Sequence, residues 1–109
     1  MEEQLRRERD QTRAQIADLT AEFDGIVASV AAESPDDEHD PSGSTTGFER
    51  QRVAALLDHA RRRLAELDDA LARVDAGAFG ICALCGAPIG LERLEARPTA
   101  TTCINCASR

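Results

Sequence analysis

Residues 77–106 read GAFGICALCGAPIGLERLEARPTATTCINC and hold all four cysteines of the chain. Two C-x2-C pairs stand 17 residues apart, Cys82 with Cys85 and Cys103 with Cys106. Each pair brings two thiolates together in one tight turn, and zinc takes four such ligands at the corners of a tetrahedron. The spacing therefore predicts one zinc ion held by these four residues.

Two other uses of paired cysteines have to be weighed. A thioredoxin-like redox motif needs a single pair in a βαβ context, which this chain does not offer. An iron–sulfur cluster remains an open alternative. A closed four-thiolate site has no free position for a substrate, so we expect a structural metal and no enzyme activity. Six apolar residues are expected to form a shell around the metal: Ile81, Leu84, Ile89, Leu91, Leu94 and Ile104.

Upstream of the cysteines, two runs of apolar residues repeat in alternating steps of four and three. This period of 3.5 residues is typical of the a/d seam of a coiled coil. The first run comprises Leu5, Thr12, Ile16, Leu19, Phe23, Ile26 and Val30, and the second comprises Val53, Leu57, Ala60, Leu64, Leu67, Leu71 and Val74.

The two runs predict helices over about residues 3–33 and 47–76. Their matched lengths and single connection favour an antiparallel hairpin. Thr46 and Glu49 form a T-x-x-E capping box for the second helix, and Gly77 follows its last seam residue as a C′ glycine. We therefore expect a mainly α protein in which a long antiparallel two-helix coiled-coil hairpin (1–78) precedes a small C-terminal C4 zinc finger (79–109).

The connection between the helices is the most acidic segment. Residues 34–46 read SPDDEHDPSGSTT, and the two prolines argue against helix through it. Helix–helix connections in bundles usually take two to eight residues, and longer ones are more often functional. A solvated linker is the simpler interpretation. The alternative is a loop that presents carboxylates at the tip of the hairpin.

Composition excludes several classes of protein. The formal net charge of -7 works against non-specific nucleic-acid binding, which depends on Lys and Arg neutralising phosphates. The N-terminus MEEQLRRERD has no apolar segment typical of a secretory signal, and no apolar run is long enough to cross a membrane. We expect a cytoplasmic protein without a membrane partner.

The stretch from Gly77 to Cys106 resembles the DksA/TraR C4-type zinc-finger proteins. Its residues follow the family signature G-x-[FY]-G-x-C-x-x-C-G-x-x-I…RLEA-x-P-x-A…C-x-x-C. The resemblance extends more loosely upstream, where a hairpin with an acidic tip precedes the finger. It implies a regulator that binds RNA polymerase, needs no sequence-specific DNA contact, and inserts its coiled coil into the secondary channel of the enzyme to modulate initiation.

The tip motif of the family is D-x-x-D followed by a small residue, usually Ala. Asp37 and Asp40 supply the two aspartates, Ser42 stands where Ala is expected, and Asp36 is a reserve carboxylate. The resemblance implies that these residues approach the catalytic magnesium of the polymerase. The serine leaves open whether transcription rises or falls.

Arg93 and Arg97 are candidate contacts to the polymerase or to a nucleotide, with solvated surface as the alternative. Family members that bind the alarmone ppGpp use basic residues, and Arg97 matches one in the RLEARP segment. A C-terminal contribution has no counterpart here, so dependence on ppGpp is not expected.

Two other functions stay open. One is a zinc-ribbon nucleic-acid binder, against which stand the acidic charge and the single aromatic residue of the finger, Phe79. The other is a structural adaptor whose coiled coil pairs with another helix, which an exposed Leu56 would support. We expect a monomer.

Overall fold

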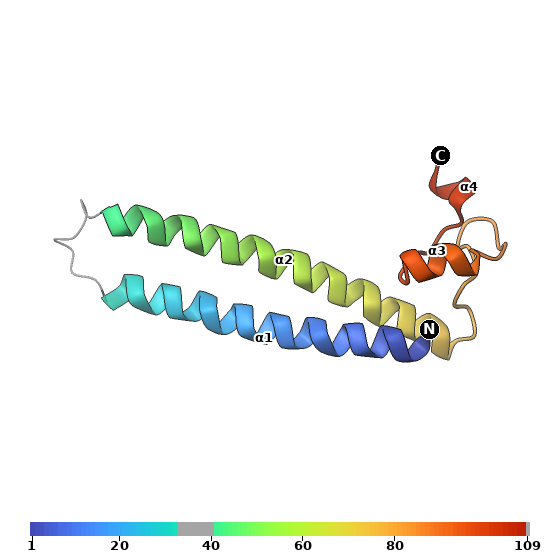
Figure 1. Ribbon diagram of the computed structural model, residues 1–109, viewed down its shortest axis with the longest axis horizontal. Coiled ribbons are helices and arrows are strands. Elements are labelled where there is room, and N and C mark those ends of the chain that lie inside the picture. Colours follow the sequence, from blue (N-terminus) through green and yellow to red (C-terminus); the bar gives the residue numbers. More distant parts are fainter. Residues whose placement is uncertain (33–40, 109) are drawn as a thin grey trace. The chain divides into compact units, whose positions relative to one another are not determined.

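The protein is mainly helical. The computed structural model describes residues 1–32 and 41–108. These contain the helices α1 (Glu2–Ala32), α2 (Pro41–Asp75), α3 (Leu91–Ala96) and α4 (Ile104–Ala107), shown in Figure 1. In the described part of the chain, no helix combines the length and apolar character that a membrane crossing requires. The predicted fold class is confirmed.

The chain forms two compact units. The first compact unit comprises Met1–Gln11 and Leu64–Arg109, and the second comprises Thr12–Arg63. Each contains paired segments of α1 and α2, and the first also contains both short helices. These compact units are not the predicted domains. The division into a hairpin domain (1–78) and a finger domain (79–109) stays a prediction.

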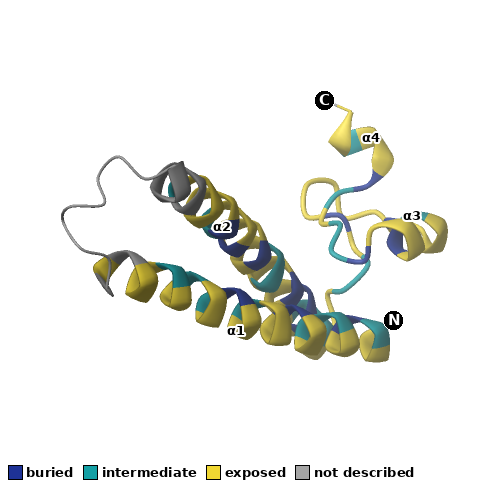
Figure 2. Ribbon diagram, turned by 60° about the vertical axis from the view of Figure 1, so that its left-hand side comes forward, coloured by how far each residue is buried: buried dark blue, intermediate teal, exposed yellow. Residues whose placement is uncertain are grey.

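In the second compact unit, α1 and α2 pack through the predicted seams. The buried cluster joins Leu19 of α1 to three residues of α2, and half-buried residues of α1 extend it. Seam positions recur along both helices as buried or half-buried residues in Figure 2. The cluster is formed by Leu19, Val53, Leu57 and Ala60, with Ile16, Phe23 and Ile26 packed against it.

The first compact unit has a cluster of the same kind. Leu5, near the start of α1, packs against Leu67, Ala70 and Leu71, near the end of α2. Leu5, Leu67 and Ala70 are all 0% exposed. Early residues of α1 thus meet late residues of α2, whereas Leu19 meets earlier ones, so the pairing is antiparallel as predicted. Ala70 lies between two predicted seam positions and was missed.

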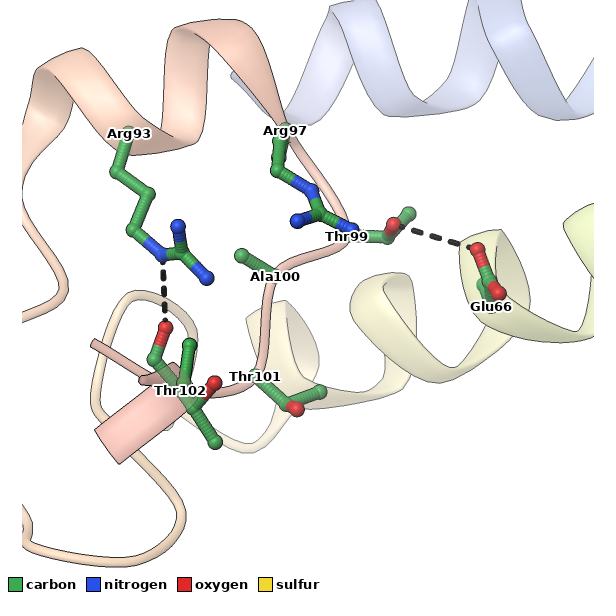
Figure 3. Close-up of a pocket in the computed structure, with 8 residues that line it drawn as sticks. Glu66, Arg93, Arg97, Thr99, Ala100, Thr101 and Thr102 are labelled. Atoms are coloured by element: carbon green, nitrogen blue, oxygen red, sulfur yellow. Dashed lines mark hydrogen bonds between the residues drawn. The ribbon is translucent and has the colours of Figure 1, made fainter. Parts of the chain in front are cut away.

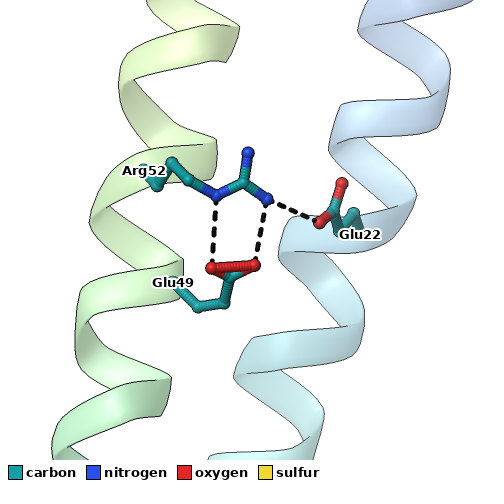
Figure 4. A network of polar contacts seen from close by, with 3 residues as sticks. All are labelled: Glu22, Glu49 and Arg52. Carbon is teal, nitrogen blue, oxygen red and sulfur yellow. Dashed lines mark hydrogen bonds and ion pairs between the residues drawn. The ribbon is translucent and has the colours of Figure 1, made fainter.

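An ion pair also links the two helices in the second compact unit. Arg52 binds the Glu49 carboxylate through Nε and Nη2, at 3.2 Å and 2.9 Å, and its Nη2 lies 3.2 Å from Glu22 Oε1 of α1 (Figure 4). The hydrogen bond from Arg52 lowers the pKa of the Glu49 carboxyl group. All three side chains are about half exposed, so solvent screening keeps their contribution to stability small.

The predicted start of α2 was wrong. The helix begins at Pro41, six residues before the predicted position, so Thr46 lies inside α2 and is not its N-cap. Glu49 pairs with Arg52 instead of completing a capping box. Proline lacks an N–H and has a φ angle already suited to the first turn, where that N–H would have no partner. Pro41 therefore starts this helix instead of excluding it.

The predicted end of α2 is confirmed by its hydrogen bonds. Ala78 N donates to Arg73 O at 2.8 Å, and Gly77 N donates to Val74 O at 3.1 Å. These are the two bonds of a Schellman motif with Gly77 at C′. The motif requires a left-handed residue there, and Gly77 has a φ of 73°.

Replacing Gly77 by alanine should destabilise the protein by about 1–2 kcal/mol, the cost of a left-handed backbone for a residue with a Cβ. Apart from Gly77 itself and the two adjacent residues, no described heavy atom lies within 4 Å of the added carbon, so the expected penalty is backbone strain. Gly25 is the matched control: it lies in α1 with the same free space, so Gly25→Ala should stabilise by about 0.5–1 kcal/mol. Urea unfolding of the zinc-loaded variants measures both, and shifts of the same sign would contradict the assignment.

Candidate metal centre

The first cysteine pair lies on a tight turn after α2. Ile81 and Pro88 form an antiparallel bridge, and Cys82 N donates to Ala87 O at 2.8 Å. Gly86 N donates to Cys82 O at 2.9 Å, which closes the turn. Gly86 has a φ of 76°, a conformation that glycine adopts readily. The turn brings the thiols of Cys82 and Cys85 to one side.

The second pair lies where the chain enters α4. Cys103 ends the loop that follows α3, and Ala107 N donates to Cys103 O at 2.9 Å. This first helical turn carries Cys106. A backbone hydrogen bond of 2.8 Å from Ala83 N to Thr101 O joins the two cysteine-bearing segments. Residues about 20 apart in sequence therefore meet in one cluster.

The four thiols have the geometry of a metal site. Their Sγ atoms all lie within 4.8 Å of one another, and those of Cys85 and Cys103 are 3.7 Å apart. With a Zn–S distance of about 2.3 Å, two ligands of a tetrahedral zinc ion lie roughly 3.8 Å apart. The donor set therefore fits one zinc ion. It is also closed, because four sulfurs fill the tetrahedron and leave no position for a substrate.

The apolar shell around the thiols is smaller than predicted. Ile89 and Leu94 are buried and cluster with Cys82 and Cys103, and Phe79 packs against them. The other predicted members are exposed: Ile81 by 45%, Leu84 by 73%, Leu91 by 65% and Ile104 by 62%. Leu84 and Ile104 are middle residues of the two C-x2-C turns. The cysteines at the ends of each turn point their thiols into the cluster, and the middle residues face solvent. The prediction for these four was wrong.

The thiols differ strongly in acidity. Hydrogen bonds from the backbone N–H groups of Cys103 and Cys85 lower the pKa of Cys82 to about 6. A backbone hydrogen bond from Cys106 also lowers the pKa of Cys103. By contrast, hydrogen bonds to the sulfurs of Cys103 and Cys82 raise the pKa of Cys106 to about 12. Clustered thiols cannot all ionise without a cation, and a metal ion supplies the missing positive charge.

Zinc affinity should therefore fall as the pH is lowered, by about tenfold per pH unit for each proton that zinc displaces. Near neutral pH, Cys106 with its pKa of about 12 must lose a proton on binding, whereas Cys82 with a pKa of about 6 is already ionised. Below about pH 6, Cys82 must lose one too, and the slope steepens. Competition with a chelator across this range measures the slope, and a pH-independent affinity would contradict it.

Arg93 and Arg97 line the same cleft beside the cysteine cluster (Figure 3). The cleft holds about 420 Å³ and lies within the first compact unit. Arg93 is half-buried and its Nε donates to Thr102 O at 2.9 Å, so it is part of the fold as well as a candidate contact. Arg97 is exposed at the end of α3. Its contact role stays a prediction.

The structure describes one of the four predicted tip residues. Asp36, Asp37 and Asp40 lie outside the described residues. Ser42 lies in the first turn of α2. Their predicted role stays a prediction.

Comparison with known proteins shows a match along nearly the whole chain. The model of the prokaryotic dksA/traR C4-type zinc finger matches residues 77–109. The RNA polymerase-binding transcription factor DksA of Escherichia coli (strain K12) is 34% identical over 103 residues, 94% of this chain. The protein of the same name from Caulobacter vibrioides (strain NA1000 / CB15N) is 48% identical over 52 residues, 48% of this chain.

These matches span 59% and 37% of the length of the two relatives. The structure of transcription factor DksA2 from Pseudomonas aeruginosa matches with a TM-score of 0.63 and 32% identity, covering 97% of this chain and 81% of that one. The zinc-finger match also decides between zinc and the iron–sulfur alternative. With this fold, this cysteine cluster and relatives of this similarity, the chain belongs to the DksA/TraR family of C4-type zinc-finger proteins.

Proposed function

We propose that the chain is a transcription regulator that binds RNA polymerase and inserts its acid-tipped hairpin into the secondary channel of the enzyme to modulate initiation. The observation that carries the proposal is the relative from Escherichia coli, which is named as an RNA polymerase-binding transcription factor and aligns with 94% of the chain. The insertion step rests on the acidic segment between the two helices.

The chemistry of the chain is consistent with this role. In the proposal, Cys82, Cys85, Cys103 and Cys106 hold one zinc ion that stabilises the finger and takes no part in a reaction. A net charge of -7 suits a protein partner with a basic channel better than a nucleic acid. The chain then acts as a non-enzymatic, monomeric factor in the cytoplasm, without sequence-specific DNA contact.

The acidic residues supply the activity in this proposal, and the rest of the chain supplies the binding. A carboxylate about 4 Å from a cation gains about 1 kcal/mol in water but about 4 kcal/mol at an effective dielectric constant of 20. Asp37 and Asp40 would therefore contribute little in free solution and much once enclosed beside a metal ion and basic side chains.

The double variant Asp37→Asn, Asp40→Asn should bind the host RNA polymerase nearly as tightly as the unmodified chain while losing most of its effect on open-complex lifetime. Asparagine preserves the size of each side chain and removes only its charge. Competition binding and transcription from a responsive promoter measure the two properties. A partial loss would indicate that Asp36 substitutes.

The matched control is Asp18→Asn with Asp58→Asn, which removes two charges from exposed residues of α1 and α2. It should bind and act like the unmodified chain. Full activity of the tip variant would reject the tip mechanism, and no binding to polymerase by the unmodified chain would reject the function itself. A salt-sensitive shift of DNA or RNA mobility would then favour the nucleic-acid-binding alternative.

A further inference from the structure

The loop that delivers Cys103 is held at three successive carbonyl groups. Thr102 O accepts a 2.9 Å hydrogen bond from Arg93 Nε of α3, and Thr101 O accepts one of 2.8 Å from Ala83 N. Ala100 O lies 3.5 Å from Arg73 Nη1 of α2. The donors thus come from α3, the first cysteine turn and α2. No residue of this loop before Cys103 belongs to the four-cysteine cluster, so these contacts can act on the ligand only through the backbone.

Arg93 makes the strongest of the side-chain contacts. Its acceptor belongs to Thr102, the residue directly before Cys103, and Cys103 is buried with its Sγ 3.7 Å from that of Cys85. A guanidinium offers several donors in a fixed plane, and a charged donor makes a stronger hydrogen bond than a neutral one. Figure 3 shows the Arg93 side chain running from α3 to this carbonyl.

Arg73 connects the same loop to the end of α2. Its own carbonyl accepts the Schellman bond from Ala78, while its side chain, 18% exposed, reaches toward Ala100. The Nε lies 3.2 Å from Asp69 Oδ2, but Nε and Nη2 are buried and form no hydrogen bond with the described residues. Burial penalises a charge that has no partner. The ion pair with Asp69 and the contact with Ala100 O compensate the charge of this guanidinium and so hold it in place.

We propose that Arg93 and Arg73 are positioning residues of the metal centre, which hold the carbonyls before Cys103 so that the second cysteine pair is in place when zinc binds. Because the loop is already ordered, its ordering does not reduce the free energy gained when zinc binds. Groups that orient metal ligands from outside the coordination sphere typically change metal affinity by about 10–100-fold when removed. Arg93 thereby has a role in this chain that needs no partner protein.

The test is the zinc dissociation constant of the full-length variants Arg93→Gln and Arg73→Gln, measured by competition with a chromogenic chelator. We expect Arg93→Gln to weaken zinc binding by about tenfold or more. Arg73→Gln should have a smaller effect in the same direction, because its contact is longer and lies three residues from the ligand. Arg97→Gln is the matched control: it lines the same cleft, is exposed, and should change the affinity less than about twofold.

Two further measurements separate positioning from a general loss of stability. Arg93→Lys retains a charged donor and should recover a large part of the zinc affinity that Arg93→Gln loses. The spectrum of the cobalt-substituted Arg93→Gln protein should show altered ligand-field bands, whereas that of Arg97→Gln should match the unmodified chain. Equal zinc affinities for Arg93→Gln and Arg97→Gln would overturn the proposal. All three readouts use the chain alone, so they are independent of whether it binds RNA polymerase.

Discussion

Replacing Cys103 by serine should reduce the zinc content to well below one equivalent per chain and unfold the finger. Cys103 is buried, and its thiol lies against that of Cys85, so its loss leaves three ligands and an open tetrahedron. Structural zinc contributes about 10–16 kcal/mol of apparent binding energy in finger peptides, far more than the small apolar cluster beside it can replace. Metal analysis of the purified variant measures the first effect.

Hydrogen exchange measures the unfolding of the finger in Cys103→Ser and shows which segments lose protection. Amide protection should be lost from the finger and from the last turns of α2, where Leu67 and Leu71 belong to the first compact unit. Protection around Val53 and Leu57, which pack in the second compact unit, should decline less. Asn105→Ser is the control, because this exposed residue lies within the same C-x2-C turn. A folded, zinc-loaded Cys103→Ser protein would refute the assignment.

Leu67→Ala should destabilise the zinc-loaded protein by about 2–5 kcal/mol. Leu67 is 0% exposed and packs against Leu5, Ala70 and Leu71, so truncation leaves a cavity between the two long helices. Chemical unfolding followed by circular dichroism gives the change in the free energy of unfolding.

Leu56→Ala is the matched control on the same helix. Leu56 is 37% exposed and lies off the seam, the exposure that the structural-adaptor alternative predicted. In a monomer its truncation should therefore cost less than about 1 kcal/mol. A cost as large as that of Leu67→Ala would mean that Leu56 is covered by another helix. Mass measurement in solution would then be expected to show a dimer, as the structural-adaptor alternative requires.

The seam was the most predictable part of the fold. A period of 3.5 residues leaves an amphipathic helix few ways to bury its apolar side chains, and Leu5, Leu19, Val53 and Leu67 are all buried as predicted. The burial of Ala70 was not predicted, because alanine is common on exposed and buried helix faces alike. The cysteine cluster was predictable for a different reason, since a C-x2-C pair constrains its own backbone whatever surrounds it.

The errors arose where a local pattern fits more than one structure, and the contacts that were not predicted join residues far apart in sequence. Pro41 fits either a helix interruption or a first helical turn, and the sequence does not distinguish them. Glu49 fits the last position of a T-x-x-E capping box, but its carboxylate forms an ion pair with Arg52. The contacts of Arg93 with Thr102 and of Arg73 with Ala100 join residues 9 and 27 positions apart, and no sequence period encodes such distances. The sequence therefore predicted either a partner contact or a solvated surface for Arg93, and not its hydrogen bond to Thr102.

In the proposed function, the acidic segment of this chain enters the secondary channel of RNA polymerase. A photo-crosslinking amino acid at position 40 tests it most directly, with position 62, on the exposed side of α2, as the comparison. We predict that position 40 crosslinks to polymerase segments around the catalytic magnesium, that excess unmodified chain abolishes the crosslink, and that position 62 gives a different set of products. Crosslinks from position 40 only to DNA, or to polymerase surfaces outside the channel, would show that the acidic segment does not enter the secondary channel.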